Sequence, residues 1–198
     1  MPFTKGINRS CIMALRKASA YTRMHVVPYT RTSSKKEKSY IKTVPPQAIV
    51  KFSMGSWQLF SEGRLPHVLT MVAEESAQIR HNALEASRQY IDKQLDTELP
   101  GQYFFRVIPF PHHIQRENKM LTGAGADRMS SGMQLSFGKS AGKAALVKEG
   151  SGIFMIATPS EKASQTVREI LRRVKPKLPC RTKIIYEFRK PEALIKNQ

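Results

Sequence analysis

The stretch TPSEKASQTVREILRRVK, residues 158–175, decides the fold class because it carries the clearest helix signals in the chain. Thr158 suits the N-cap position, Pro159 the first helical position, and Glu161 the third residue after the cap. Pro176 ends the pattern. Apolar residues recur with helical spacing between these limits, which predicts a buried face formed by Ala163, Val167, Ile170, Leu171 and Val174. The stretch therefore predicts an amphipathic helix that packs against other elements.

Short strands are predicted on both sides of this helix. Residues 182–188 (TKIIYEF) form a bounded run rich in β-branched and aromatic residues, and residues 144–148 and 152–157 resemble a hairpin. Upstream, strands are predicted at 48–53, 66–73 and 103–109, and a second helix at 74–95. Two helices among short strands predict an α+β fold, with two helices packed on one face of a mostly antiparallel sheet.

The charge balance limits the kinds of partner that the protein can bind. The 198 residues carry 33 Lys and Arg against 15 Asp and Glu, a net charge of +18. A domain this basic repels itself unless an anionic partner neutralises it, and nucleic acid is the leading candidate. An anionic membrane is second, and no apolar run approaches the roughly 20 residues that span a bilayer. No membrane partner and no homo-oligomer are expected.

Much of the positive charge lies in residues 1–42, which contain ten cations and one acid, Glu37. We interpret this segment as an RNA-binding arm, with Arg31 among its contacts and tyrosines able to stack on bases. Two alternatives stay open, a disordered solubilising tail and a transit peptide. Consecutive prolines, Pro45 and Pro46, close the arm, so we predict an arm at 1–42 and a single α+β domain at 43–198.

A long glycine-rich loop, residues 116–143, is predicted to protrude from this domain. It contains five glycines and five cations and has no helical or strand period. Long structureless loops in compact domains are uncommon unless they are functional or disordered. Glycines also allow the backbone to approach an RNA surface closely.

Enzymatic readings of the loop fail on spacing. A phosphate-binding loop requires a glycine where Met133 stands, and Gly132 misses that position by one. The Ser140-x-x-Lys143 spacing of some acylating enzymes lacks its companion motifs.

His112 and His113 could bind a metal but have no further ligand nearby in sequence. The two cysteines, Cys11 and Cys180, fit reduced thiols. No catalytic residues, metal or cofactor are predicted.

Seven motifs resemble one known family. They are 28–31 (PYTR), 78–86 (QIRHNALEA), 111–113 (PHH), 116–120 (RENKM), 123–128 (GAGADR), 132–133 (GM) and 137–139 (FGK). In order and content they resemble the large-subunit ribosomal proteins called L-ten-e in archaea and eukaryotes and L-sixteen in bacteria. The resemblance runs from about residue 16 to residue 188.

The resemblance implies a hammerhead-type α+β fold and a non-enzymatic protein of the cytoplasmic ribosome. The implied partners are large-subunit rRNA, A-site tRNA and neighbouring large-subunit proteins. In the family the loop reaches toward the peptidyl transferase region and helps to position tRNA. Together with the charge pattern, this predicts an RNA- and tRNA-binding set of Arg31, Arg80, His81, His112, His113, Arg116, Lys119, Gly123, Gly125, Asp127, Arg128, Gly132, Lys139, Lys143, Arg172 and Arg173.

The chain departs from the family at Gln134, Ser140 and Leu146, where the family often has arginine, proline and arginine. The exit of the loop is therefore less basic. Residues 1–15 extend beyond the usual archaeal start, and the long C-terminal extension of eukaryotic members is missing, which favours an archaeal-type protein. The alternative hypothesis is an RNA-binding or RNA-chaperone module that acts outside the ribosome.

Overall fold

The computed structural model describes residues 29–30, 41, 43–117 and 139–189. Within them the elements follow the order β1 (Ser53–Gly55), α1 (Trp57–Ser61), β2 (His67–Ala73), β3 (Ala77–Arg80), α2 (His81–Glu98), β4 (Phe104–Val107), β5 (His113–Glu117), β6 (Lys139–Val147), β7 (Gly152–Thr158), α4 (Glu161–Val174), the 3-10 helix η3 (Lys175–Lys177) and β8 (Thr182–Phe188). The mixture of helices and antiparallel strands confirms the α+β class.

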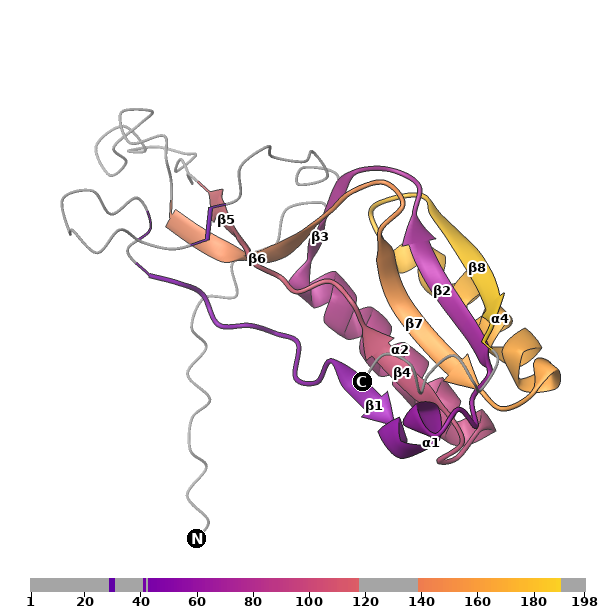
Figure 1. The fold of residues 1–198 in the computed structure, drawn as a ribbon. Helices are drawn as coiled ribbons and strands as arrows, with labels where there is room; N and C mark the ends of the chain where they lie inside the picture. Colours follow the sequence, from indigo (N-terminus) through magenta and orange to yellow (C-terminus); the bar gives the residue numbers. More distant parts are fainter. Residues whose placement is uncertain (1–28, 31–40, 42, 118–138, 190–198) are drawn as a thin grey trace, which may run out of the picture.

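The strands form two antiparallel sheets. One has five strands in the order β1-β4-β7-β2-β8, and the other has three in the order β3-β6-β5. Figure 1 shows α2 and α4 behind the five-stranded sheet, while β5 and the start of β6 project away from it. The predicted packing of two helices on one sheet face is thus confirmed, and the smaller sheet is a feature that we did not predict.

The main core lies between the five-stranded sheet and the two long helices. Leu69, Phe105 and Phe154 from the sheet meet Leu84 and Ile91 from α2 and the apolar side of α4. On the opposite face a smaller cluster forms around α1, where the rings of Phe60 and Phe104 stack with centroids 4.8 Å apart. The five-stranded sheet is therefore covered on one face by the two long helices and in part on the other face by α1, whereas most of β8 is exposed.

Three predicted boundaries are wrong. The helix predicted from residue 74 begins at His81, because residues 77–80 pair with β6 as strand β3. Ala77, Gln78 and Ile79 are all buried, so burial in β3 shows no two-residue alternation, and the pairing with β6 alone marks it as a strand. The strand predicted at 48–53 is displaced to Ser53–Gly55. The N-cap of α4 is Ser160, whose hydroxyl accepts a hydrogen bond from the Ala163 amide, and Thr158 ends β7 instead.

The predicted hairpin at 144–157 is also wrong. β6 pairs with β3 and β5, whereas β7 pairs with β2 and β4. The chain therefore crosses from the small sheet to the large one at residues 148–151, where Gly150 adopts a φ of 79°. The predicted loop is shorter than 116–143, since β5 extends to Glu117 and β6 begins at Lys139. Residues 118–138, like most of the predicted arm, lie outside the described residues.

Candidate nucleic-acid interface

The three-stranded sheet brings together most of the described residues of the predicted RNA-binding set. Arg80 on β3 and His113 on β5 both pair with Ala144 on β6. Lys143 pairs with Ile114, and Arg116 with Ser140. Directly paired residues lie on the same face of a sheet. Residues that are more than 60 positions apart in sequence thus become neighbours.

The centre of this small sheet is polar and buried. The Gln115 side-chain amide donates to the Gln78 side-chain oxygen across the sheet at 3.2 Å, and each residue is 3% exposed. His113 is 2% exposed. A buried polar group is costly without a partner, so such a connected row fixes the sheet register. The structure therefore places His113 in a structural position, inside the sheet and not on its surface.

Tyr29, a described residue of the predicted arm, is held against β5 by four contacts. The Ile114 amide donates to the Tyr29 carbonyl at 2.7 Å, and the Tyr29 amide donates to His113 Nδ1 at 3.1 Å. The guanidinium of Arg116 lies 3.8 Å from the centroid of the Tyr29 ring, and the Tyr29 and His113 rings are 5.8 Å apart. We call Tyr29, His113, Ile114 and Arg116 the arm clamp. It joins the root of the arm to the strand that leads into the loop.

The arm clamp yields a local prediction. Tyr29→Ala should speed hydrogen exchange at the Ile114 amide several-fold, because losing a cation–π contact of about 0.5–2 kcal/mol loosens the segment that accepts that hydrogen bond. The Ile156 amide in the main core should exchange as before. Tyr29→Phe keeps the ring and is the matched control. Unchanged exchange at Ile114 in the alanine variant would show that the ring does not hold the arm root.

His81 sits where β3, α2 and β6 meet. Its Nδ1 accepts a hydrogen bond from the Ala48 amide at 3.2 Å, and a Cβ at Gly142 would lie 3.3 Å from its Nε2. Burial lowers the pKa of His81, and the charges of Arg80 and Lys143 lower it further. The neutral ring is therefore the stable form in the folded chain, and protonation below its usual pKa of about 6.5 favours unfolding. The structure gives His81 a role in joining these elements.

The cations of the small sheet remain accessible to different degrees. Lys139 is exposed at the start of β6, while Arg80, Arg116 and Lys143 are half-buried. Glu117 and Lys139 pair across the base of the loop. The other predicted residues of this region, Arg31, Lys119, Gly123, Gly125, Asp127, Arg128 and Gly132, lie outside the described residues.

One predicted residue borders the small sheet and two lie away from it. His112 is half-buried just before β5, and its Nδ1 is 2.9 Å from the carbonyl of Phe110. Arg172 and Arg173 are exposed in the last turn of α4, which packs on α2, β2 and β7. The predicted set therefore divides between two parts of the molecule.

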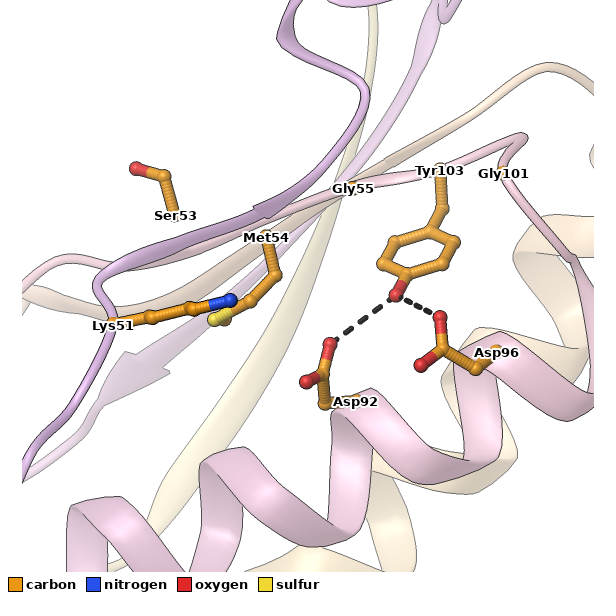
Figure 2. Close-up of a pocket in the computed structure, with 8 residues that line it drawn as sticks. All are labelled: Lys51, Ser53, Met54, Gly55, Asp92, Asp96, Gly101 and Tyr103. Carbon is orange, nitrogen blue, oxygen red and sulfur yellow. Dashed lines mark hydrogen bonds between the residues drawn. The ribbon is translucent and has the colours of Figure 1, made fainter.

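A pocket of about 360 Å³ opens beside α2 and is lined by Lys51, Ser53, Met54, Gly55, Asp92, Asp96, Gly101 and Tyr103. Figure 2 shows the Tyr103 hydroxyl directed at Asp92 and Asp96, to which it donates hydrogen bonds at 3.2 and 2.5 Å. Burial first, and then the hydrogen bond to Asp96, raise the pKa of Tyr103. The phenol thus stays protonated and fastens β4 to α2, which is a structural role.

None of the helices in the described ranges is both long and apolar enough to cross a membrane. No group of three or more His, Cys, Asp or Glu side chains in those ranges could hold a metal ion.

Comparison with known proteins places the chain in context. The model of the family described as Ribosomal protein L16p/L10e matches residues 28–185. Three similar proteins are each named large ribosomal subunit protein uL16. The one from Thermofilum pendens is 42% identical over 88% of this chain and 98% of its own length. The one from Pyrobaculum calidifontis is 42% identical over 88% of this chain and 95% of its own length. The one from Methanococcus aeolicus is 39% identical over 93% of this chain and 100% of its own length.

Proposed function

Because the chain belongs to the ribosomal protein L16p/L10e family, we propose that its small sheet binds large-subunit rRNA and that its loop helps to position tRNA. Family membership makes the protein a constituent of the large ribosomal subunit in the cytoplasm and not an enzyme. It also implies rRNA and other ribosomal proteins as partners. The sites of contact, and any role beside A-site tRNA and the peptidyl transferase region, are our proposals.

The observation that carries this proposal is the joint anchoring of two basic segments on one small sheet. Tyr29, which lies within the predicted arm, is hydrogen-bonded to β5, and Glu117 pairs with Lys139 where β5 and β6 border the predicted loop. Residue 29 of the predicted arm and both strands that bound residues 118–138 therefore lie at the same small sheet. Two basic segments with a shared origin can engage one continuous RNA surface.

The chemistry fits phosphate binding. Lys139 is exposed and Arg80 and Lys143 are half-buried around this sheet, and residues 1–42 add ten cations. Cations that neutralise phosphates release counterions, so the affinity falls steeply with added salt. The described part of the sheet offers the buried amides of Gln78 and Gln115, and the adjoining His81 at the start of α2 has a lowered pKa. Its contribution is to hold and orient the segments that touch RNA.

Deleting residues 123–132 tests the loop's role. The deletion should leave thermal unfolding within a few degrees of the wild-type value, because the stretch adds no residue to the described core. Translation by ribosomes that carry the variant should be slowed several-fold. A matched control replaces the same ten positions with a glycine–serine segment of equal length, which separates loss of the loop's side chains from a change in its length.

Two outcomes would contradict this proposal. Normal translation by the deletion variant would remove the loop from tRNA positioning. A grossly unfolded variant would show that the loop belongs to the core. The hypothesis of an RNA-binding module outside the ribosome gains no support from the described residues, whereas the match to ribosomal proteins covers most of the chain.

A further inference from the structure

The outer strand of the large sheet, β8, has a long edge with no strand partner among the described residues. β8 ends the strand order β1-β4-β7-β2-β8, and within the described ranges it pairs with β2 alone. Figure 1 shows it at the outer side of the sheet. The other edges are shorter or occupied, since β1 has three residues and β3 has four, and the Ile114 amide of β5 donates to the Tyr29 carbonyl.

β8 lacks the features with which proteins usually protect an edge strand. Its seven residues pair with β2 in one continuous register, without a bulge or a proline. Ile185, Tyr186 and Phe188 expose apolar surface along it. His67 orders the two rings, since its Nδ1 lies 2.7 Å from the Tyr186 hydroxyl and its ring meets Phe188 edge-on. A long, regular edge with exposed apolar side chains is a site for pairing with another strand.

Two hydrogen bonds at the ends of β8 show which of its backbone groups point away from β2. The Arg189 amide donates to the Pro66 carbonyl at 2.8 Å, and the Glu74 amide donates to the Arg181 carbonyl at 2.9 Å. In an antiparallel pair, the backbone groups of successive residues point alternately toward the partner strand and away from it. The odd-numbered residues of β8 therefore bond to β2. The amides and carbonyls of the even-numbered residues point to the open edge.

The charges on β8 complement a second copy of the same strand. If two copies pair antiparallel about Ile185, the even-numbered residues form the hydrogen-bonded pairs, and Lys183 of each copy lies opposite Glu187 of the other. Such non-hydrogen-bonded pairs have Cα atoms about 4.5 Å apart, so the opposite charges meet closely. Among the described residues Lys183 has no carboxylate within salt-bridge distance, and Glu187 has one cation, Arg189, at 3.6 Å. A shift of the register in either direction separates the lysine from the glutamate.

We propose that two copies of this chain associate through β8, in an antiparallel pair centred on Ile185 that joins two five-stranded sheets into one. The dimer is symmetric, because each copy gives and receives the same contacts. This inference departs from the expectation that the chain forms no homo-oligomer. It goes beyond the proposed function and does not rest on it, since it concerns the chain without RNA.

Repulsion and size both limit the strength of this dimer. Each copy carries a net charge of +18, but that repulsion is long-ranged and is screened by salt, whereas the facing pairs on β8 are local. The flanking Arg181 and Arg189 of opposite copies would face each other, and each is paired with a carboxylate of its own copy, Glu75 or Glu187. One pair of strands is expected to bury less than the roughly 1,200 Å² of stable interfaces, so the dimer is weak and reversible.

Sedimentation equilibrium of the full-length, RNA-free chain in about 0.3 M salt tests the inference. The wild-type chain should show a reversible monomer–dimer equilibrium at concentrations up to about 200 μM. Lys183→Glu and Glu187→Lys should each weaken association at least about ten-fold, because like charges then face each other twice. An equal mixture of the two variants should form mixed dimers as tight as the wild-type dimer, because opposite charges face each other again.

The matched control is Lys51→Glu, which makes the same change in charge as Lys183→Glu at an exposed position two residues before β1. Both variants lower the net charge, so a general effect of repulsion would strengthen association in both. The control should therefore dimerise at least as well as the wild type.

Hydrogen exchange locates the contact on the strand. The Tyr186 amide, which points to the open edge, should become protected as the concentration of the wild-type chain rises. The Ile185 amide, which points to β2, should be protected at every concentration and in every variant, which shows that the strand remains folded.

Three results would overturn the inference. A wild-type chain that stays monomeric at about 200 μM would leave the edge to a strand of another protein. A dimer that neither β8 variant weakens would place the contact elsewhere in the chain. A mixture of the two variants that does not associate would exclude the proposed register. None of these results affects the proposed function, because RNA is absent from the measurement.

Discussion

An Arg88→Ala variant is expected to unfold with about 3–5 kcal/mol less free energy than the wild-type chain at pH 7. Arg88 and Glu85 are each 8% exposed, and the Arg88 guanidinium donates to both carboxylate oxygens of Glu85, at 2.9 and 2.8 Å. It also contacts Asp92 at 3.3 Å. Removing the guanidinium leaves a buried carboxylate with only weaker donors, chiefly the Gln89 side-chain amide at 3.0 Å. Urea denaturation at several pH values measures the loss.

The loss of stability in the Arg88→Ala variant should depend on pH. The hydrogen bond from Arg88 is the main cause that lowers the pKa of Glu85, while burial opposes it. In the wild-type chain the ionised pair thus stabilises the fold above the unfolded pKa of about 4.3, and this stabilisation is lost as the pH falls through the lower folded value. Without Arg88, burial should raise the pKa of Glu85 instead. The difference between the two proteins should therefore be greatest near pH 7 and shrink on acidification.

Arg64→Ala is the control, because the Arg64–Glu62 pair has a similar distance of 3.0 Å but lies in solvent. Exposed pairs contribute about 0–1 kcal/mol, so this variant should remain close to the wild type. Equal effects of the Arg88 and Arg64 variants would contradict the structural role assigned to the buried pair. So would an Arg88 effect that does not change with pH.

Gly55→Ala is expected to destabilise the chain by about 2–4 kcal/mol. Gly55 has a φ of 79°, a conformation that costs other residues about 1–2 kcal/mol. A Cβ at this position would also lie 2.2 Å from the carbonyl oxygen of Tyr103, which accepts a hydrogen bond from the Ser56 amide at 2.9 Å. Backbone atoms must shift to relieve the overlap, at a further cost of about 1–3 kcal/mol.

The chain supplies a matched control for this substitution. Gly101 has a φ of 70°, but a Cβ there would meet nothing within 4 Å. Gly101→Ala therefore carries the backbone strain without the overlap and should cost only about 1–2 kcal/mol. The denaturant midpoints of the two variants show how much the steric overlap adds to the backbone strain. Equal losses of stability in the two variants would show that β1 and β4 move apart easily and that the overlap costs no measurable free energy.

Local sequence patterns correctly predicted the helices and strands that are specified by their own residues and not by distant pairing. Residues 66–73 and 182–188 are bounded runs of strand-forming residues, and the strands observed are His67–Ala73 and Thr182–Phe188. The second long helix is also confirmed, since an apolar stripe and clear end signals specify α4. The predicted stretch at 74–80 failed because pairing with β6 overrides a stripe that a helix would also satisfy.

The sequence allowed us to predict which residues belong to the site, but not how they are arranged in space. Motifs drew attention to Arg80, His113 and Arg116, and β-sheet pairing does bring them to one small sheet. Nothing local could show that Tyr29 would pack on Arg116 instead of on a base, because that contact joins residues 87 positions apart. The buried pair Gln78 and Gln115 was missed for the same reason. Gln78 lay in the predicted helix at 74–95 and Gln115 lay outside every predicted strand, so no local signal pointed to this pair.

Sedimentation of the full-length chain in extracts of growing cells tests the central claim most directly, namely that the small sheet and its two basic segments attach the protein to large-subunit RNA. The wild-type chain should co-sediment with large subunits and not with small ones, and should remain bound after a moderate salt wash. A Lys139→Glu/Lys143→Glu variant should be released at lower salt, because each reversed cation removes a phosphate contact. A wild-type chain that stayed at the top of the gradient would contradict the account.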